Sequence, residues 1–171
     1  MEISRDNRSF IEIGDDFMDI LGVLKELNIE YELQEHKAVY TVDDLKDVFM
    51  EMEGIGCKNL FLKDAKKNLF LYTLPDNKRA DLKILPEKIN SKRLSFANEN
   101  DLQEYLGLTP GSVTPLGIIN DKEQKVTVVL DKELKNNKVL IHPNRNTATV
   151  SIKYEDLIKF INHCGNEYIE I

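Results

Sequence analysis

Two stretches in the middle of the chain are apolar on both faces of an extended strand. Leu-Phe-Leu at 60–62 forms the first, and Leu-Phe-Leu-Tyr-Thr-Leu at 69–74 forms the second. The polar sequence Lys-Lys-Asn at 66–68 separates them, which predicts a hairpin. A strand that is apolar on both faces usually lies inside a sheet. We therefore expect the strand that begins at Lys58 to be central in its sheet.

The rest of the chain mixes helical and strand periodicity. Apolar residues at helical spacing predict helices over 17–27, 42–52, 80–89, 101–106 and 154–162. Period-two alternation predicts strands over 30–36, 93–97, 125–131, 138–142, 147–152 and 168–171. Thr41 and Asp44 form a variant of the capping box at the start of the second helix. Helices and strands do not alternate strictly and hairpins are frequent, which indicates an α+β fold with a mixed, largely antiparallel β-sheet and flanking helices.

Length and composition indicate one folded unit. The chain has 171 residues, 42% of them hydrophobic, which is enough to bury a full core. No internal repeat and no linker divides the chain, so we expect a single domain over 1–171. Residues 1–14 are polar with some alternation, and we expect a short N-terminal arm or edge strand there.

Several cellular settings are disfavoured by the sequence. No apolar run approaches the roughly 20 residues that span a bilayer, and the first residues are too polar for a signal peptide. Cys57 and Cys164 are the only cysteines and are far apart, which fits a reducing compartment. We expect a cytoplasmic protein with no membrane partner.

The charge is unevenly distributed. The whole chain carries −7, but residues 58–93 hold ten Lys and Arg against four Asp and Glu, so that segment is +6 and the remainder is −13. A basic zone in an acidic protein can bind a polyanion in one orientation. The alternative is a set of solvated turns, which charge alone favours.

The motifs of the common enzyme classes are missing. The sequence has no GxGxxG, Walker loop, HExxH or GxSxG. His36, His142 and His163 are the only histidines, and none stands at helical i, i+4 spacing to another, so we expect no metal site and no cofactor. Cys57 stands at the start of a strand, where nothing lowers a thiol pKa, and a core thiol is the favoured interpretation.

Three polar groups lie at the ends of otherwise apolar strands: Lys58-Asn59, the Gly-Ser-Val-Thr-Pro loop at 111–115, and the segment 142–148 that begins with His142. A loop with Gly at one end and Pro at the other can direct successive backbone N–H groups at one oxyanion. Each group also has a plainer interpretation. Lys58 can be a surface lysine, the loop a rigid connector, His142 a hydrogen-bonded structural histidine, and Asn146 and Thr147 caps of a turn.

The three groups together carry a resemblance to a known family. The chain resembles the YbaK/ProX family of aminoacyl-tRNA editing domains, and in particular its free-standing prolyl-tRNA editing branch. The motifs are Lys-Asn-Leu-Phe-Leu-Lys-Asp at 58–64, Gly-Ser-Val-Thr-Pro at 111–115 and His-Pro-Asn-Arg-Asn-Thr-Ala-Thr at 142–149, with support at 36–42, 93–97 and 156–160. They follow the order of the family and span residues 17 to about 170. Arg145 stands where the family commonly has a small or hydrophobic residue.

The resemblance implies a function that composition does not. Members of the family hydrolyse the ester of a mischarged aminoacyl-tRNA, and the branch in question acts on tRNA for proline that carries alanine. The resemblance further implies an editing-domain fold, with the acceptor end of tRNA(Pro) as substrate and prolyl-tRNA synthetase as a candidate partner.

The resemblance also assigns roles to residues. It makes Lys58, Gly111 and His142 the catalytic candidates, with Lys58 holding the substrate end. The loop backbone binds the aminoacyl group, and the helix that begins at Thr41 covers the terminal adenosine. The other candidates for substrate binding are Asn59, Ser112, Val113, Thr114, Pro115, Asn146 and Thr147.

Elementary chemistry refines these roles. A lysine has a pKa of about 10.4, so Lys58 suits anchoring of phosphate or ribose better than general-base catalysis. With no obvious protein base, the ribose hydroxyl of the substrate can position or activate water, which gives metal-free, substrate-assisted hydrolysis. The alternatives are removal of cysteine, serine or threonine by the same chemistry, a non-catalytic regulatory module that binds tRNA or a synthetase, and a hydrolase of small free esters.

Overall fold

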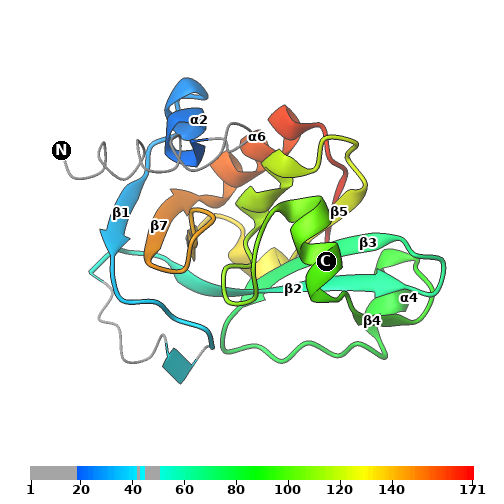
Figure 1. The fold of residues 1–171 in the computed structure, drawn as a ribbon. Helices are drawn as coiled ribbons and strands as arrows, with labels where there is room; N and C mark the ends of the chain where they lie inside the picture. The colour runs from blue at the N-terminus through cyan, green and yellow to red at the C-terminus, as the bar shows by residue number, and fades with distance from the viewer. Residues whose placement is uncertain (1–18, 42, 45–50) are drawn as a thin grey trace.

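The computed structural model describes residues 19–41, 43, 44 and 51–171. Within these ranges eight strands form one sheet in the order β1-β7-β6-β2-β3-β5-β8, with β4 also beside β2 (Figure 1). The strands are β1 (Glu32–Glu35), β2 (Ile55–Asp64), β3 (Leu69–Pro75), β4 (Leu94–Phe96), β5 (Val126–Leu130), β6 (Lys138–Ile141), β7 (Ala148–Lys153) and β8 (Tyr168–Glu170). Four of the pairings are antiparallel and three are parallel, so the predicted mixed, largely antiparallel sheet is confirmed. The hairpin of β2 and β3 is also as predicted.

The helices follow the sequence periodicity only in part, and α6 runs two residues past its predicted end. They are α2 (Ile20–Glu26), α4 (Leu85–Ile89), α5 (Glu99–Asp101), α6 (Tyr154–Cys164), the π-helical turn η1 (Leu102–Leu106) and the 3₁₀ turns η2 (Pro115–Asn120) and η3 (Lys132–Leu134). The helix predicted over 80–89 forms only in its second half. The Asp81 carbonyl accepts from the amides of Ile84 and Leu85, which makes a turn before α4 begins. The predicted arm at 1–14 lies outside the described residues.

The sheet is covered on both faces, and alternation along β3 shows how. Leu69 and Leu71 belong to a large core under α2 and α6, whereas Phe70, Tyr72 and Leu74 belong to a smaller core under α4. Because successive side chains of a strand point to opposite faces, a strand between two cores is apolar on both faces, and Thr73 is the one hydroxyl residue buried within β3 besides the tyrosine. Figure 1 shows α2 and α6 together on one side, with α4 beside β3 and β4.

The central strand starts earlier than predicted. β2 begins at Ile55, so Lys58 is its fourth residue, and Gly56 lies within the strand rather than breaking the chain before it. Gly56 is needed for a steric reason: a Cβ at this position would collide with the Asp76 carboxylate. β2 is central, as expected, since it pairs with β3, β4 and β6.

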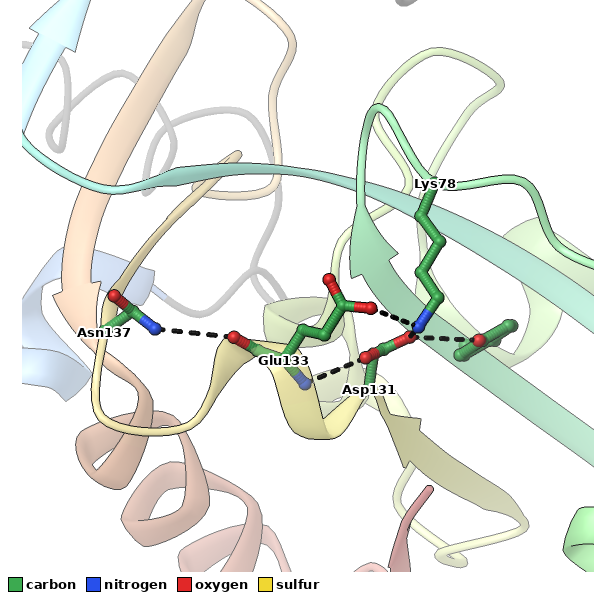
Figure 2. Close-up of polar contacts among 5 residues, drawn as sticks. Lys78, Asp131, Glu133 and Asn137 are labelled. Atoms are coloured by element: carbon green, nitrogen blue, oxygen red, sulfur yellow. Dashed lines mark hydrogen bonds and ion pairs between the residues drawn. The ribbon is translucent and has the colours of Figure 1, made fainter.

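A buried carboxylate fixes the loop that follows β3 to the end of β5 (Figure 2). Lys78 lies 2.7 Å from both Asp131 and Glu133, and the Tyr72 hydroxyl donates to Asp131. These hydrogen bonds, first from Asp131 and then from Glu133, raise the pKa of Lys78. Lys78 therefore belongs to a structural ion pair, although the sequence places it in the basic zone.

No helix in the described part of the chain combines the length and the apolar character that a membrane crossing requires.

Candidate active site

The candidate site lies where one edge of the central strand β2 has no paired strand. β6 pairs with β2 only at Ile55 and Gly56, and β4 joins the same edge only from Leu62 onward. The Gly56 carbonyl accepts from the Asp76 amide on the β3 side, whereas the Phe61 carbonyl accepts from Ala97 on the other edge. Backbone groups of alternate residues face opposite edges, so the N–H and C=O of Asn59 face the open edge.

A pocket of about 270 Å³ lies at this opening. Its lining combines a segment before the second predicted helix, four consecutive residues of β2, the Gly111 loop and the residue after β6. The lining residues are Val39, Tyr40, Thr41, Cys57, Lys58, Asn59, Leu60, Gly111, Val113 and His142. Six of the eleven residues nominated from the sequence, from four separate segments, therefore meet in one cavity.

Lys58 brings an uncompensated positive charge to the pocket. It is half-buried, and among the described residues no carboxylate lies within ion-pairing distance of its ammonium group. Its neighbour Lys63 differs, because it pairs with Asp101 at 2.7 Å. A lysine that forms no ion pair at a half-buried position is available to an anionic ligand.

His142 enters the pocket because β6 runs parallel to β2. Gly56 lies opposite Leu140, and Lys58 and His142 each follow two residues later, where the strands have separated and both residues line the pocket. The His142 Nδ1–H donates to the Ala148 carbonyl at 2.8 Å, which leaves Nε2 as the acceptor of the neutral ring. Burial, followed by the neighbouring His36, lowers the pKa of His142 and outweighs the opposing effect of the Ala148 hydrogen bond.

The Gly111 loop presents free amides to the same cavity. Gly111 has φ +91°, a conformation that side chains rarely adopt, and an added Cβ would lie 2.8 Å from the Tyr40 ring. Among the described residues, no acceptor lies within hydrogen-bond distance of the Gly111 and Val113 amides. The Ser112 amide, in contrast, donates to the Thr109 carbonyl at 3.0 Å. The amides of Gly111 and Val113 are thus available to a ligand, whereas the Ser112 amide between them closes the turn.

The other nominated residues hold the pocket in place and do not line it. The Thr114 hydroxyl, fully buried, donates to the His142 carbonyl at 2.7 Å and ties the loop to the histidine. The Asn146 side chain donates to the Val39 carbonyl at 2.8 Å. Thr147 accepts from Arg145, whose guanidinium also pairs with Glu35 at 3.1 Å. Ser112 and Pro115 are buried.

Asn59 and Thr41 are each oriented by one partner. The Asn59 side-chain oxygen accepts a 2.6 Å hydrogen bond from Thr73, directly opposite in β3. Asp44 accepts from the Thr41 amide, and the Thr41 hydroxyl accepts from the Asp44 amide, so the predicted capping box is present. Most of the helix predicted after it, 45–50, lies outside the described residues.

Cys57 lines the pocket but is not a nucleophile. Burial, reinforced by Asp76, raises the pKa of its thiol to about 12. A thiol with such a pKa carries almost no thiolate at neutral pH, which supports its interpretation as a core thiol. No cluster of three or more His, Cys, Asp or Glu side chains suited to a metal occurs in the described residues.

Sequence reasoning missed the apolar and aromatic part of the lining. Val39 and Leu60 look like ordinary core residues, and only the diverging strands turn them toward a cavity. Tyr40 is 67% exposed at the rim of the pocket. A large aromatic directly before a helix cap was the one signal that could have identified it.

Residues 36–160 match the family profile described as the aminoacyl-tRNA editing domain. This stretch covers most of the chain and contains every residue of the pocket lining.

The chain belongs to the aminoacyl-tRNA editing domain family. Similar proteins include the prolyl-tRNA editing protein ProX of Acetoanaerobium sticklandii. It is 44% identical to this chain over 151 residues, which cover 87% of this chain and 92% of that protein. The prolyl-tRNA synthetase associated domain-containing protein 1 of Danio rerio is 38% identical over 141 residues, 81% of this chain and 77% of that protein. The predicted resemblance is confirmed, as is the class of aminoacyl-tRNA editing enzyme.

The fold of this editing domain is also found among solved structures. The crystal structure of hypothetical protein APE2540 matches with a TM-score of 0.68 and covers 88% of this chain and 97% of that chain. At 18% identity this match concerns the fold alone.

Proposed function

We propose that the protein is a trans-editing hydrolase that removes alanine from mischarged Ala-tRNA(Pro). The convergence of Lys58, the open amides of the Gly111 loop and neutral His142 on one pocket carries the proposal. The name of the relative from Acetoanaerobium sticklandii, a prolyl-tRNA editing protein, supports proline tRNA as the substrate.

In the proposed reaction, water attacks the ester carbonyl of the alanyl group. The bond between that carbon and the ribose oxygen breaks, and free alanine and a tRNA with an intact ribose leave. The amides of Gly111 and Val113 stabilise the negative charge that develops on the carbonyl oxygen, a contribution worth about 10²–10³ in rate for one such donor. Because these donors are fixed backbone groups, they need no reorganisation during the reaction.

Lys58 anchors the terminal nucleotide through phosphate or ribose, where a permanent cation is most useful. His142 Nε2 accepts a hydrogen bond from the ribose hydroxyl or from the attacking water, which orients it toward the ester. The ribose hydroxyl assists, and the proposal assigns no step to a metal. Asn59 and Val113 border the alanine side chain, and the apolar wall of Val39 and Leu60 limits its size.

Discrimination against cognate Pro-tRNA(Pro) is proposed to be steric. A missing methylene supplies only about 1–3 kcal/mol of discrimination, whereas a pocket too small for the pyrrolidine ring excludes it by overlap. Cytoplasmic location and association with prolyl-tRNA synthetase fit this role. The synthetase is suggested only by the name of the relative from Danio rerio.

The test is a substrate panel measured by release of radiolabelled amino acid. Ala-tRNA(Pro) should be deacylated, and Pro-tRNA(Pro) and free alanine ethyl ester should be spared. Activity should survive EDTA. Faster release from Cys-tRNA(Pro) or Ser-tRNA(Ala) would show that the enzyme removes cysteine or serine in preference to alanine. Binding of tRNA with no release from any substrate would instead show a regulatory module.

A further inference from the structure

A single buried carboxylate organises the far end of β2. Asp64 is 5% exposed and accepts from the backbone amides of Lys66, Asn68 and Lys92, as well as from the Asn68 side chain. It thereby fastens the β2–β3 turn to the segment between α4 and β4. Although burial alone would raise the pKa of Asp64, these hydrogen bonds outweigh it and hold the pKa below its usual value.

The consequence is a cluster of exposed cations from two separate segments. Lys66 and Lys67 belong to the β2–β3 turn, and Lys92 and Arg93 belong to the segment before β4. All four are exposed, and none has a carboxylate within ion-pairing distance among the described residues. We call these four residues the basic tip.

Two other lysines of the same segment behave differently. Lys63 is paired with Asp101, and Lys78 is paired with Asp131 and Glu133 (Figure 2). The Asp64 carboxylate accepts hydrogen bonds from backbone N–H groups and forms no ion pair with the four cations. The basic tip therefore retains free positive charge on a protein with a net charge of −7.

An exposed aromatic ring lies beside the basic tip. Phe96 on β4 is 62% exposed, which is unusual for phenylalanine. It stands opposite Leu62 in the β2–β4 pairing, so the two side chains share a face of the sheet. Lys58 and Leu60 precede Leu62 on that strand at two-residue steps, so β2 links the pocket to the ring.

The distances along β2 fit a single-stranded nucleic acid end. Six residues separate Lys58 from Asp64, about 20 Å at the rise of a strand, with Phe96 between them. Exposed aromatic rings and free cations in a row are the combination that binds single-stranded nucleic acid without sequence preference.

We propose that Phe96 and the basic tip form the track for the tRNA acceptor arm, an inference that rests on the proposed function. The terminal nucleotide occupies the pocket, an unpaired base next to it stacks on Phe96, and backbone phosphates of the acceptor stem contact Lys66, Lys67, Lys92 and Arg93. An RNA occupant is favoured over a protein one because the track combines one exposed aromatic ring with cations that form no ion pair with the described residues.

The test measures binding of uncharged tRNA(Pro) transcript, with and without its 3′-terminal CCA. Phe96→Ala should weaken binding of the full transcript about tenfold, as expected for one lost stacking contact. It should leave binding of the truncated transcript unchanged, and Phe96→Tyr should bind as the wild type does. Equal binding of the full transcript by Phe96→Ala and wild type would overturn the role of the ring.

The basic tip is tested by reversing charge. Lys66→Glu/Lys67→Glu should weaken binding of both transcripts and reduce the slope of log K against log salt by about 0.7–0.9 for each lost phosphate contact. The matched control is Lys153→Glu/Lys159→Glu, two exposed lysines at the start of and on α6, with the same change in net charge. Equal weakening by both double variants would overturn the basic tip as a specific contact.

The design separates this inference from the proposed function. Single-turnover deacylation by Phe96→Ala at subsaturating protein should slow in proportion to its weaker tRNA binding, because the ring acts on binding and touches no reacting atom. If the wild type releases no alanine but the binding differences appear, the editing reaction fails and the track stands. If alanine is released and the binding differences are absent, the track alone is wrong. Tyr168→Ala, at another exposed ring, controls for loss of aromatic surface.

Discussion

Gly111 combines an unusual backbone conformation with a place in the pocket lining. Its φ of +91° opens the loop, and the Tyr40 ring packs where a side chain would stand. Gly165, at the end of α6, has a similar φ of +83°, but an added Cβ there meets nothing closer than 3.5 Å. Substitution of each glycine by alanine therefore distinguishes the effect of backbone strain on stability from the effect of a blocked site on activity.

Gly111→Ala should lose both stability and activity, and Gly165→Ala stability only. Each should lower the free energy of unfolding by about 1–2 kcal/mol, because alanine is strained at positive φ. Only Gly111→Ala should reduce deacylation, since its methyl group displaces Tyr40 and shifts the amides. Urea denaturation and single-turnover deacylation measure the two effects. Equal activity of both variants would mean that the Gly111 amide is not part of the site.

His142 should be neutral in the folded protein at pH 7. Because its pKa is lowered, the folded state resists protonation that the unfolded chain accepts near pH 6.5. Its contribution to stability is therefore complete above about pH 6.5 and is lost as pH falls toward the folded pKa. Deacylation should decline over the same acidic range. The ring titration by NMR, with His163→Asn to assign signals, checks this; a midpoint above 6.5 would contradict it.

At the scale of elements, sequence periodicity predicted which segments of the chain form strands, but not where neighbouring strands separate in the sheet. The central position of β2 follows from apolar residues on both faces, a local property. The start of β2 at Ile55 does not, because Ile55 and Gly56 pair with Val139 and Leu140 of β6, a strand distant in the sequence. The pocket likewise arises from β6 leaving β2 after Gly56. No pattern along one segment encodes that divergence, so the sequence nominated Lys58, Asn59 and His142 but not Val39, Tyr40 or Leu60.

The Asp64 carboxylate holds the β2–β3 turn in place through its hydrogen bonds. Its folded pKa is lowered, so its stabilisation is present above the unfolded value of about 3.9 and is lost as pH falls through the folded pKa. Asp64→Asn should cost about 1–3 kcal/mol at pH 7 and progressively less toward pH 2. Denaturation at several pH values measures this, with exposed Asp81→Asn as control. A penalty independent of pH would show that charge is unimportant there.

At the scale of the whole molecule, both thiols report on global unfolding. Burial, with a contribution from Asp76 at Cys57 and from Asp121 at Cys164, raises each pKa to about 12. One lies in β2 and the other at the end of α6, and both pack against the larger core. Each is only partly exposed in the folded protein, so full exposure of both together requires that this core open.

Both cysteines should react slowly with iodoacetamide in the native protein at pH 8. Their rates should rise together across the urea transition, because the unfolded thiols regain a pKa near 8.5. Mass spectrometry of the alkylated peptides distinguishes the two sites. Rapid native alkylation of Cys57 alone would show a reactive thiol in the pocket and would revive a cysteine hydrolase.

For the whole molecule, the proposed editing function depends on Lys58 as the anchor of the substrate end. Its ammonium has no ion-pair partner among the described residues, so Lys58→Ala should change the free energy of unfolding by less than about 0.5 kcal/mol. Lys63→Ala, which breaks the pair with Asp101, is the matched control on the same strand.

The decisive measurement is therefore single-turnover release of alanine from Ala-tRNA(Pro). Wild type and Lys63→Ala should both release it, and Lys58→Ala should be slower by about 100-fold or more, as for a substrate no longer held in register. Release by Lys58→Ala at the wild-type rate would contradict the account.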